Sequence, residues 1–180
     1  MNPYCVDIKL DIPVFNPKVN LESFTKSYWN NVPKYDLNME ILRFLKGFGL
    51  QISKAELFYS EPNAFTPIHT DGAPEDMAKL NWVFGGENST MNWYKPTTDK
   101  PVKISEYHTL YKGFELSEVE LVHSQAVGTP SIVQVGVPHN ATNGSNPRWC
   151  LCLILMWADQ TRKERPTMGQ VVELLSEYII

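Results

Sequence analysis

The sequence predicts a mainly β fold, a β-sandwich or jelly roll with helices packed against its outside. Thirteen prolines and ten glycines in 180 residues indicate many turns, which favours β-structure over a helical bundle. Between residues 52 and 157, about eight short segments have the apolar pattern of strands, and polar turn clusters separate them. Because helical patterns occur only before and after this region, we expect the helices to flank a β-core.

A chain of 180 residues corresponds to about one domain, and it is long enough to bury a core without disulfide or metal staples. We therefore expect a single domain over residues 1–180. It would consist of a helical N-terminal lead over 1–50, a β-core over 52–157 and a C-terminal helix over 167–179.

The N-terminal lead begins with a short strand, which is followed by an irregular segment rich in proline and asparagine. Asn20 is a suitable N-cap for a short helix that continues to about Asn30, and Pro33 would stop it. A second helix is predicted over 37–47, with an apolar stripe formed by Ile41, Phe44, Leu45 and Phe48.

The β-core opens with a half-buried strand around residues 54–59. Further strands are predicted over 79–84, 90–95, 103–111, 118–127, 130–137 and 148–157. The last two contain almost only β-branched or bulky apolar residues, so we expect them at the centre of a sheet. After the core, Thr167 and Gln170 form a capping box that predicts the start of the C-terminal helix.

Composition disfavours several classes of function. The net charge is −4 and no run of basic residues exceeds two, which disfavours nucleic acid as a partner. The N-terminus carries charges where a signal peptide needs an apolar run, and the longest apolar run, over 149–158, is half a membrane span. The three cysteines do not form a disulfide framework. We therefore expect a cytoplasmic protein without a membrane partner, and its oligomeric state stays open.

Three residues indicate a metal site. His69 and Asp71 stand two positions apart at a strand end, so both side chains leave the same side of the backbone and can reach one ion. His139 is the best third ligand, because it follows the apolar strand over 130–137 at the start of a polar turn. Two histidines and one carboxylate are the ligand set that leaves open positions on Fe(II).

Arg148 begins the last strand of the predicted core and shares a face with Cys150 and Cys152. A guanidinium on an apolar buried strand is costly unless an anion pairs with it. That anion is either a carboxylate of the protein or the carboxylate of a ligand.

Each of these signals has an alternative. An H-x-D motif also arises by chance in an ordinary turn, and structural arginine–carboxylate pairs are common. His123 is the rival third ligand, although it lies in the middle of a strand and no Arg or Lys follows it at a useful distance.

The order of the motifs is H-x-D, a histidine 68 positions after the aspartate, and an arginine nine residues further on. This order resembles the Fe(II)/2-oxoglutarate-dependent oxygenases, in particular prolyl-hydroxylase-like and short bacterial or phage-type members. The resemblance covers about residues 52–157. It includes a tyrosine-led segment YSEPNAFTPIHTDG, the hairpin KLNWVFGGENSTMNWY and the distal-histidine segment VGVPHNATNGSNPRWCLCL. Many members carry Ser or Thr two residues after the arginine, where this chain has Cys150.

The resemblance implies a double-stranded β-helix, a cupin-like jelly roll, and a dioxygenase of the hydroxylase type. Fe(II) would be held by His69, Asp71 and His139, and the far carboxylate of the cosubstrate 2-oxoglutarate would pair with Arg148. With O2, such an enzyme hydroxylates a primary substrate and releases succinate and CO2. No catalytic residue is expected beyond the metal centre.

Five further residues are secondary candidates. Tyr59 and Asn81 are predicted to contact 2-oxoglutarate. Trp82, Trp93 and Tyr94 are predicted to line the mouth through which the substrate enters. A position in the core or at a sheet edge is the alternative for each of them.

Two other functions fit parts of the pattern. A non-oxidative cupin-like metal enzyme, an isomerase or hydrolase, would keep the three metal ligands but would not need Arg148. A non-catalytic jelly-roll binding module would need neither the three metal ligands nor Arg148. The primary substrate stays open between a small molecule, an amino acid and a peptide.

Overall fold

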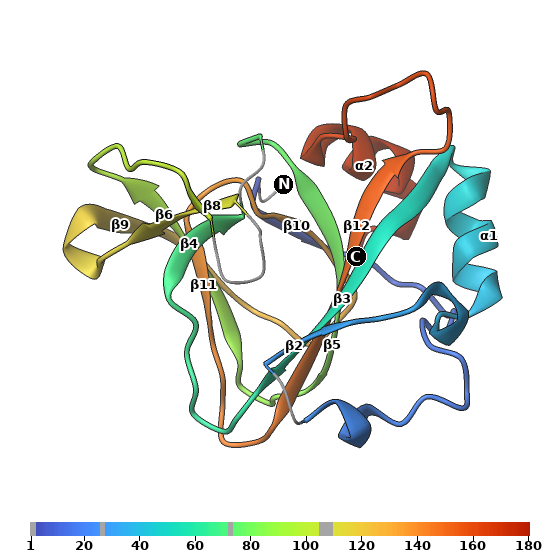
Figure 1. Cartoon of the computed structure of the whole chain (residues 1–180), viewed down its shortest axis with the longest axis horizontal. Helices are drawn as coiled ribbons and strands as arrows, with labels where there is room; N and C mark the ends of the chain where they lie inside the picture. Colours follow the sequence, from blue (N-terminus) through green and yellow to red (C-terminus); the bar gives the residue numbers. More distant parts are fainter. Residues whose placement is uncertain (1–2, 26–27, 72–73, 105–109) are drawn as a thin grey trace.

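Two antiparallel six-stranded sheets face each other in the computed structural model, which describes residues 3–25, 28–71, 74–104 and 110–180 (Figure 1). The major sheet has the order β1 (Cys5–Asp7), β10 (Ser131–Gln134), β5 (Ala78–Gly85), β12 (Arg148–Trp157), β3 (Leu50–Ser60) and β2 (Trp29–Asn31). The minor sheet has the order β7 (Lys103–Ile104), β8 (Leu110–Phe114), β4 (Ile68–Asp71), β11 (His139–Thr142), β6 (Thr90–Pro96) and β9 (Val119–Ala126). This arrangement is a jelly roll, and it confirms the predicted mainly β fold.

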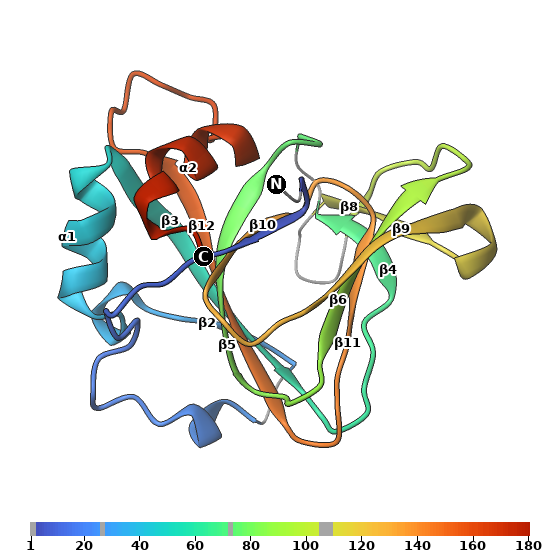
Figure 2. The same ribbon diagram turned by 180° about the vertical axis from the view of Figure 1, so that it is seen from behind.

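The two α-helices cover the outer face of the major sheet, on the side away from the minor sheet (Figure 1, Figure 2). They are α1 (Met39–Gly47) and α2 (Met168–Leu174). Short 3-10 helices occur at Leu21–Phe24, Lys34–Asp36, Leu116–Glu118 and Ser176–Tyr178. Within the described residues, no helix has the length and apolar character needed to cross a membrane.

Strand β12 divides the interior into an apolar half and a polar half. Leu151 and Leu153 are fully buried among the side chains of α1, α2 and the major sheet. Arg148, Cys150 and Cys152 alternate with them and line a cavity on the side of the minor sheet. The period-two pattern of this strand therefore places one face in the main core and the other in the space between the sheets.

The predicted helix from Asn20 to Asn30 is wrong in most of its length. Among the described residues of this range, only Leu21–Phe24 is helical, as a 3-10 turn that Asn20 caps. Residues 29–31 form strand β2 instead, which pairs with the edge of β3. Ser and Asn are weak helix formers in this segment, and pairing with β3 satisfies backbone groups that a helix would leave exposed at the sheet edge.

The predicted strand over 130–137 is too long, and the turn that was expected after it is a strand. β10 ends at Gln134, the chain crosses to the minor sheet, and His139 is the first residue of β11. Gly136 allows this crossing, because a Cβ at that position would collide with the backbone of Pro74 and Glu75. His139 thus stands at the start of a strand and not after the end of one.

The other predicted elements lie close to their expected ranges. α1 falls within the helix predicted over 37–47. The capping box of Thr167 and Gln170 is present, but α2 ends at Leu174 and a 3-10 turn follows it. The strand predicted over 103–111 comprises β7 and the start of β8, and residues 105–109 lie outside the described part of the chain.

The packing of β12 gives the first prediction. Replacement of Leu153 by Ala should lower the free energy of unfolding by about 2–5 kcal/mol, because it leaves a cavity in the main core. The matched control is Leu121→Ala, at a leucine that is 60% exposed on β9, where a change within about 0.5 kcal/mol is expected. Urea unfolding measures both, and equal effects would contradict the assigned core.

Candidate metal centre

The three predicted metal ligands meet between the sheets, on two neighbouring strands of the minor sheet. His69 and Asp71 lie on β4, and His139 on β11 pairs directly opposite His69. The two imidazole centroids are 4.7 Å apart. One ligand atom from each of the three residues lies within 4.8 Å of the others. The cluster can therefore hold one metal ion.

Backbone carbonyl groups orient both histidine rings. The Nδ1 atom of His69 lies 2.8 Å from the carbonyl oxygen of Pro67, and that of His139 lies 2.9 Å from the carbonyl oxygen of Val137. A ring nitrogen that faces a carbonyl carries the proton, so in both neutral rings Nε2 keeps its lone pair for a metal.

Lys79 on β5 crosses the interior and forms an ion pair with the candidate ligand Asp71. Its Nζ atom lies 2.7 Å from Asp71 Oδ2, while Asp71 Oδ1 lies 3.4 Å from His69 Nε2. On its other side, the ammonium group of Lys79 lies 3.5 Å from Glu56, which also binds Lys54 at 2.7 Å. Lys79 and Glu56 are both buried. This row of alternating charges holds the Asp71 carboxylate in place and leaves Oδ1 for the ion.

The protonation states of the ligands follow from these contacts. Burial alone would raise the pKa of Asp71, but Lys79 and the two histidines hold that pKa well below its usual range. Burial, and then the charge of His69, lower the pKa of His139 to about 4. For His69, burial would lower the pKa, but the hydrogen bond and charge of Asp71 outweigh it and raise the pKa. At neutral pH, Asp71 is thus ionised and His139 is neutral, as metal binding requires.

Arg148 lines the same narrow cavity from β12 and has no carboxylate partner there. It is 5% exposed, and among the described residues no carboxylate lies within ion-pair distance of its guanidinium. The Nε atom of Arg148 has no hydrogen-bond partner, and neither does the Oδ1 atom of the buried Asn81 on β5. The unpaired donor on Arg148, a residue that lines this cavity, favours an anionic ligand as its partner.

The position two residues after Arg148 places a thiol in the cavity. Cys150 and Cys152 are buried, and their sulfur atoms are 3.7 Å apart. The hydrogen bond with Cys152 outweighs burial and lowers the pKa of Cys150, with a further contribution from the charge of Arg148. The sulfur atom of Cys150 thus lies beside the guanidinium, at the position where many of the oxygenases that the sequence resembles carry a hydroxyl group.

Lys79 and Tyr28 are among the residues of this cavity that sequence analysis did not predict. Tyr28 precedes β2, and its ring packs edge-on against Phe58 at 5.6 Å. Burial, and then the proximity of Cys152 and Cys150, raise the pKa of its hydroxyl to about 12. Tyr28 was hidden by the mistaken helix, whereas Lys79 has a readable signal, a lysine on the same face of an apolar strand as Asn81.

The structure does not bring four of the predicted side chains to this cavity. Tyr59 lies on the other face of β3, where its ring packs on Trp149 at 5.4 Å. Trp82 belongs to the main core. Trp93 is fully buried in a second core cluster, where it donates to the carbonyl oxygen of Gln134. Tyr94 lines a different cavity. Aromatic residues on these strands thus serve the core more than the site.

His123, the rival third ligand, lies away from the cluster. It is opposite Trp93 in the pairing of β6 with β9, and its ring stacks against Trp93 at 5.6 Å and Tyr4 at 6.1 Å. It is not among the residues whose ligand atoms converge.

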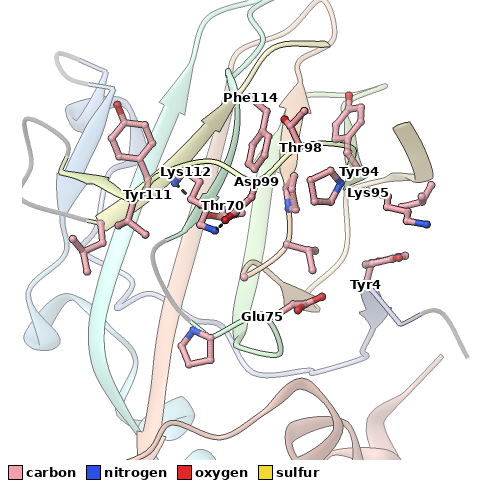
Figure 3. A pocket seen from close by; sticks show the side chains of 18 residues that line it. Tyr4, Thr70, Glu75, Tyr94, Lys95, Thr98, Asp99, Tyr111, Lys112 and Phe114 are labelled. Atoms are coloured by element: carbon pink, nitrogen blue, oxygen red, sulfur yellow. Dashed lines mark hydrogen bonds and ion pairs between the residues drawn. The ribbon is translucent and has the colours of Figure 1, made fainter. Parts of the chain in front are cut away.

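A cavity of about 610 Å³ lies on the other face of β4 (Figure 3). Thr70 faces it from between the two metal ligands of that strand, and Tyr94 and Phe114 form part of its wall. Lys112 and Asp99 form a 2.9 Å ion pair there. This cavity shares no described lining residue with the metal pocket, so it is separate from the metal site.

Comparisons with known proteins give only distant likenesses. No protein-family model and no curated protein matches the chain. A 2OG-Fe(II) oxygenase family oxidoreductase from Burkholderia pseudomallei has 14% identity and a TM-score of 0.39, over 66% of this chain and 51% of that one. E. coli ycfD has 12% identity and a TM-score of 0.40, over 75% of this chain and 31% of that one.

A Bacillus subtilis oxalate decarboxylase with Mn(II) centres has 15% identity and a TM-score of 0.32, over 58% of this chain and 24% of that one. The matches span about half or less of these longer proteins. Likenesses at these TM-scores carry no argument about function, so the interpretation of the site depends on its own geometry.

The buried charge row gives the second prediction. Lys79→Met leaves Asp71 and Glu56 without their shared cation and should destabilise the metal-free protein by about 3–5 kcal/mol. Saturating Mn(II) should restore more stability to this variant than to the unaltered protein, because the ion replaces the missing positive charge. Lys54→Met, at a partly exposed lysine, is the control and should cost less than about 1 kcal/mol. Equal stabilisation of both proteins by Mn(II) would place the ion away from Asp71.

The lowered pKa of His139 gives the third prediction. Its folded-state pKa of about 4 lies below the ordinary value of 6.5. The contribution of the neutral ring to the free energy of unfolding is therefore complete above pH 6.5 and is lost as the pH falls toward 4. The titration of His139 alone should lower the free energy of unfolding of the metal-free protein by about 2 kcal/mol between pH 7 and pH 5. His139→Asn should remove that component in urea titrations at the two pH values. An unchanged pH dependence in the variant would show that His139 is not buried as a neutral ring.

Proposed function

We propose that the protein is an Fe(II)- and 2-oxoglutarate-dependent oxygenase that hydroxylates a small molecule, an amino acid or a peptide. One observation carries the proposal, which is that a buried arginine without a carboxylate partner shares a cavity with the His–Asp–His cluster. The cluster alone fits several kinds of metal enzyme. The arginine adds the requirement that the ligand beside the metal is an anion.

The donor set suits Fe(II). Two imidazole nitrogens and one carboxylate oxygen converge from the adjacent strands β4 and β11, and this combination leaves positions on the ion for other ligands. Zn(II) and Mn(II) accept the same donors, so the identity of the metal depends on what else the cavity binds.

The cavity is narrow, with a volume of about 80 Å³, and the polar groups along its wall suit the two ends of a short diacid. In the pairing of β12 with β5, Cys152 is opposite Asn81. Arg148 is four residues before Cys152, so its Cα lies about 13 Å along β12 from the level of Asn81. The long arginine side chain covers part of this distance. A compact ligand with a carboxylate at each end can span the rest, with one end on the guanidinium and the other at the metal cluster.

Each residue then has a distinct task. Arg148 binds and orients the far carboxylate of 2-oxoglutarate, and the Nδ2 group of Asn81, on the wall of the same cavity, donates to the end near the metal. Lys79 holds Asp71, and Met91 and Val135 help to exclude water from the cavity. When bound, Fe(II) and 2-oxoglutarate supply the oxidising chemistry, with O2 as the oxidant and succinate and CO2 as products.

Ligand binding to Mn(II)-loaded protein tests this assignment, with isothermal titration calorimetry as the measurement. We expect 2-oxoglutarate to bind more tightly than pyruvate, which lacks the far carboxylate, and than glutarate, which lacks the keto group. Arg148→Met should weaken 2-oxoglutarate binding about 100-fold and leave pyruvate binding nearly unchanged, because only the first ligand reaches the guanidinium. Arg162→Met, at an arginine that packs on Trp157, is the control.

The other outcomes favour the alternatives. Metal binding without 2-oxoglutarate binding would favour a non-oxidative cupin-like enzyme. Failure to bind any divalent metal would favour a non-catalytic binding module. An equal loss of 2-oxoglutarate and pyruvate binding in Arg148→Met would show that the arginine only supports the fold of the cavity.

A further inference from the structure

A second hollow adjoins the metal pocket beside β2 and the chain between β3 and β4. We call it the outer hollow, and its volume is about 290 Å³. It is lined by Thr25, Tyr28, Tyr59, Ser60, Glu61, Ala64, Phe65 and Thr66. Three of these residues, Tyr28, Ser60 and Thr66, also line the metal pocket, so the two spaces share a wall.

The lining of the outer hollow combines aromatic rings with one negative charge. Tyr28, Tyr59 and Phe65 supply the rings, and Glu61 is the one charged residue among the described lining residues. Partial burial of Tyr59 and the carboxylate of Glu61 beside it raise the pKa of the tyrosine hydroxyl, so it stays protonated at neutral pH. Aromatic faces together with a carboxylate form an environment that favours cations.

Neighbouring side chains and strands hold this lining in place. Tyr28 packs against Phe58 at 5.6 Å, and Tyr59 against Trp149 at 5.4 Å. The backbone of Phe65 bridges to that of Thr142 on β11. Tyr59 thus stands on β3 of the major sheet, Tyr28 directly precedes β2, and the backbone of Phe65 is bridged to the minor sheet.

Charge is divided between the two spaces. The cationic side chains Arg148 and Lys79 lie on the wall of the metal pocket and suit an anion, whereas no Lys or Arg is among the described residues of the outer hollow. Thr66 is three residues before the metal ligand His69, so its Cα is at most about 10 Å from that of the histidine. A group held in the outer hollow is thus within the reach of a short chain that extends toward the metal.

We propose that the outer hollow binds the cationic group of the primary substrate, which we infer to be an alkylamine such as a basic amino acid or its side chain. The role of the amine as a substrate rests on the proposed oxygenase function, whereas the binding of a cation in the outer hollow does not depend on that function. The ammonium group would lie against the rings of Tyr28, Tyr59 and Phe65 and be neutralised by Glu61, and the alkyl chain would run past Thr66 toward the metal.

A matched pair of probes tests the cation site on the metal-free protein. Choline carries a quaternary ammonium group, and 3,3-dimethylbutan-1-ol has the same shape without the charge. We expect choline to perturb the NMR signals of Tyr28, Tyr59 and Phe65 and to bind about 10-fold more tightly than the alcohol. Equal binding of the two probes, or no perturbation of these signals by choline, would overturn the proposal.

Two variants at exposed positions make the test specific. Glu61→Gln and Phe65→Ala should each weaken choline binding about 5-fold and leave binding of the neutral alcohol nearly unchanged. Glu120→Gln, at an exposed residue of β9, is the charge-matched control and should have no effect. Unaltered choline binding in both variants would contradict the assigned residues.

The result can be separated from the proposed oxygenase function. Choline binding to metal-free protein, together with no 2-oxoglutarate binding to the Mn(II)-loaded protein, would refute the oxygenase alone and keep the cation site. The reverse pattern would refute the cation site and keep the oxygenase. When both bind, amines tested with iron-loaded protein should increase succinate formation more than neutral analogues of the same length.

Discussion

Two buried cations, Lys79 and Arg148, face the space between the sheets, and among the described residues only Lys79 has a carboxylate partner. A buried charge without a counterion is costly, so this imbalance constrains what the protein can be. The carboxylates of Asp71 and Glu56 neutralise the charge of Lys79. We propose that a ligand pairs with Arg148 and also reaches the His–Asp–His cluster, which lines the same cavity. The proposed diacid cosubstrate is the simplest molecule that satisfies the guanidinium and reaches the metal.

The sheet architecture explains why these groups meet although they are distant in the sequence. Pairing of β11 with β4 sets His139 opposite His69. Pairing of β12 with β5 sets the strand of Arg148 beside the strand that carries both Lys79 and Asn81. On each strand, alternate residues enter the core, so the polar residues emerge together between the sheets. The apolar half of β12, packed under the two helices, holds this polar half in register.

Much of this arrangement was predictable from local patterns. The alternation along β12 separated Arg148 and the cysteines from the leucines, and the spacing of His69 and Asp71 placed two side chains on one face. Properties that depend on pairing across the fold were not predictable in this way. No local pattern shows that Tyr28 reaches the cavity from the position just before edge strand β2, or that Trp82 and Tyr59 face away from the cavity. The chain crossing before His139 was also missed, because the apolar run over 130–137 continues through the point where the strand ends.

The most direct test of the central claim is an anaerobic titration of metal-stripped protein with Fe(II) and then 2-oxoglutarate, followed by visible absorbance. We predict a weak metal-to-ligand charge-transfer band that requires both additions, because the keto acid chelates iron held by the protein. The band should be lost in His139→Ala, and in Arg148→Met it should need a much higher concentration of 2-oxoglutarate. Absence of the band from protein that has bound iron would contradict the claim that the cavity holds the metal and the diacid together.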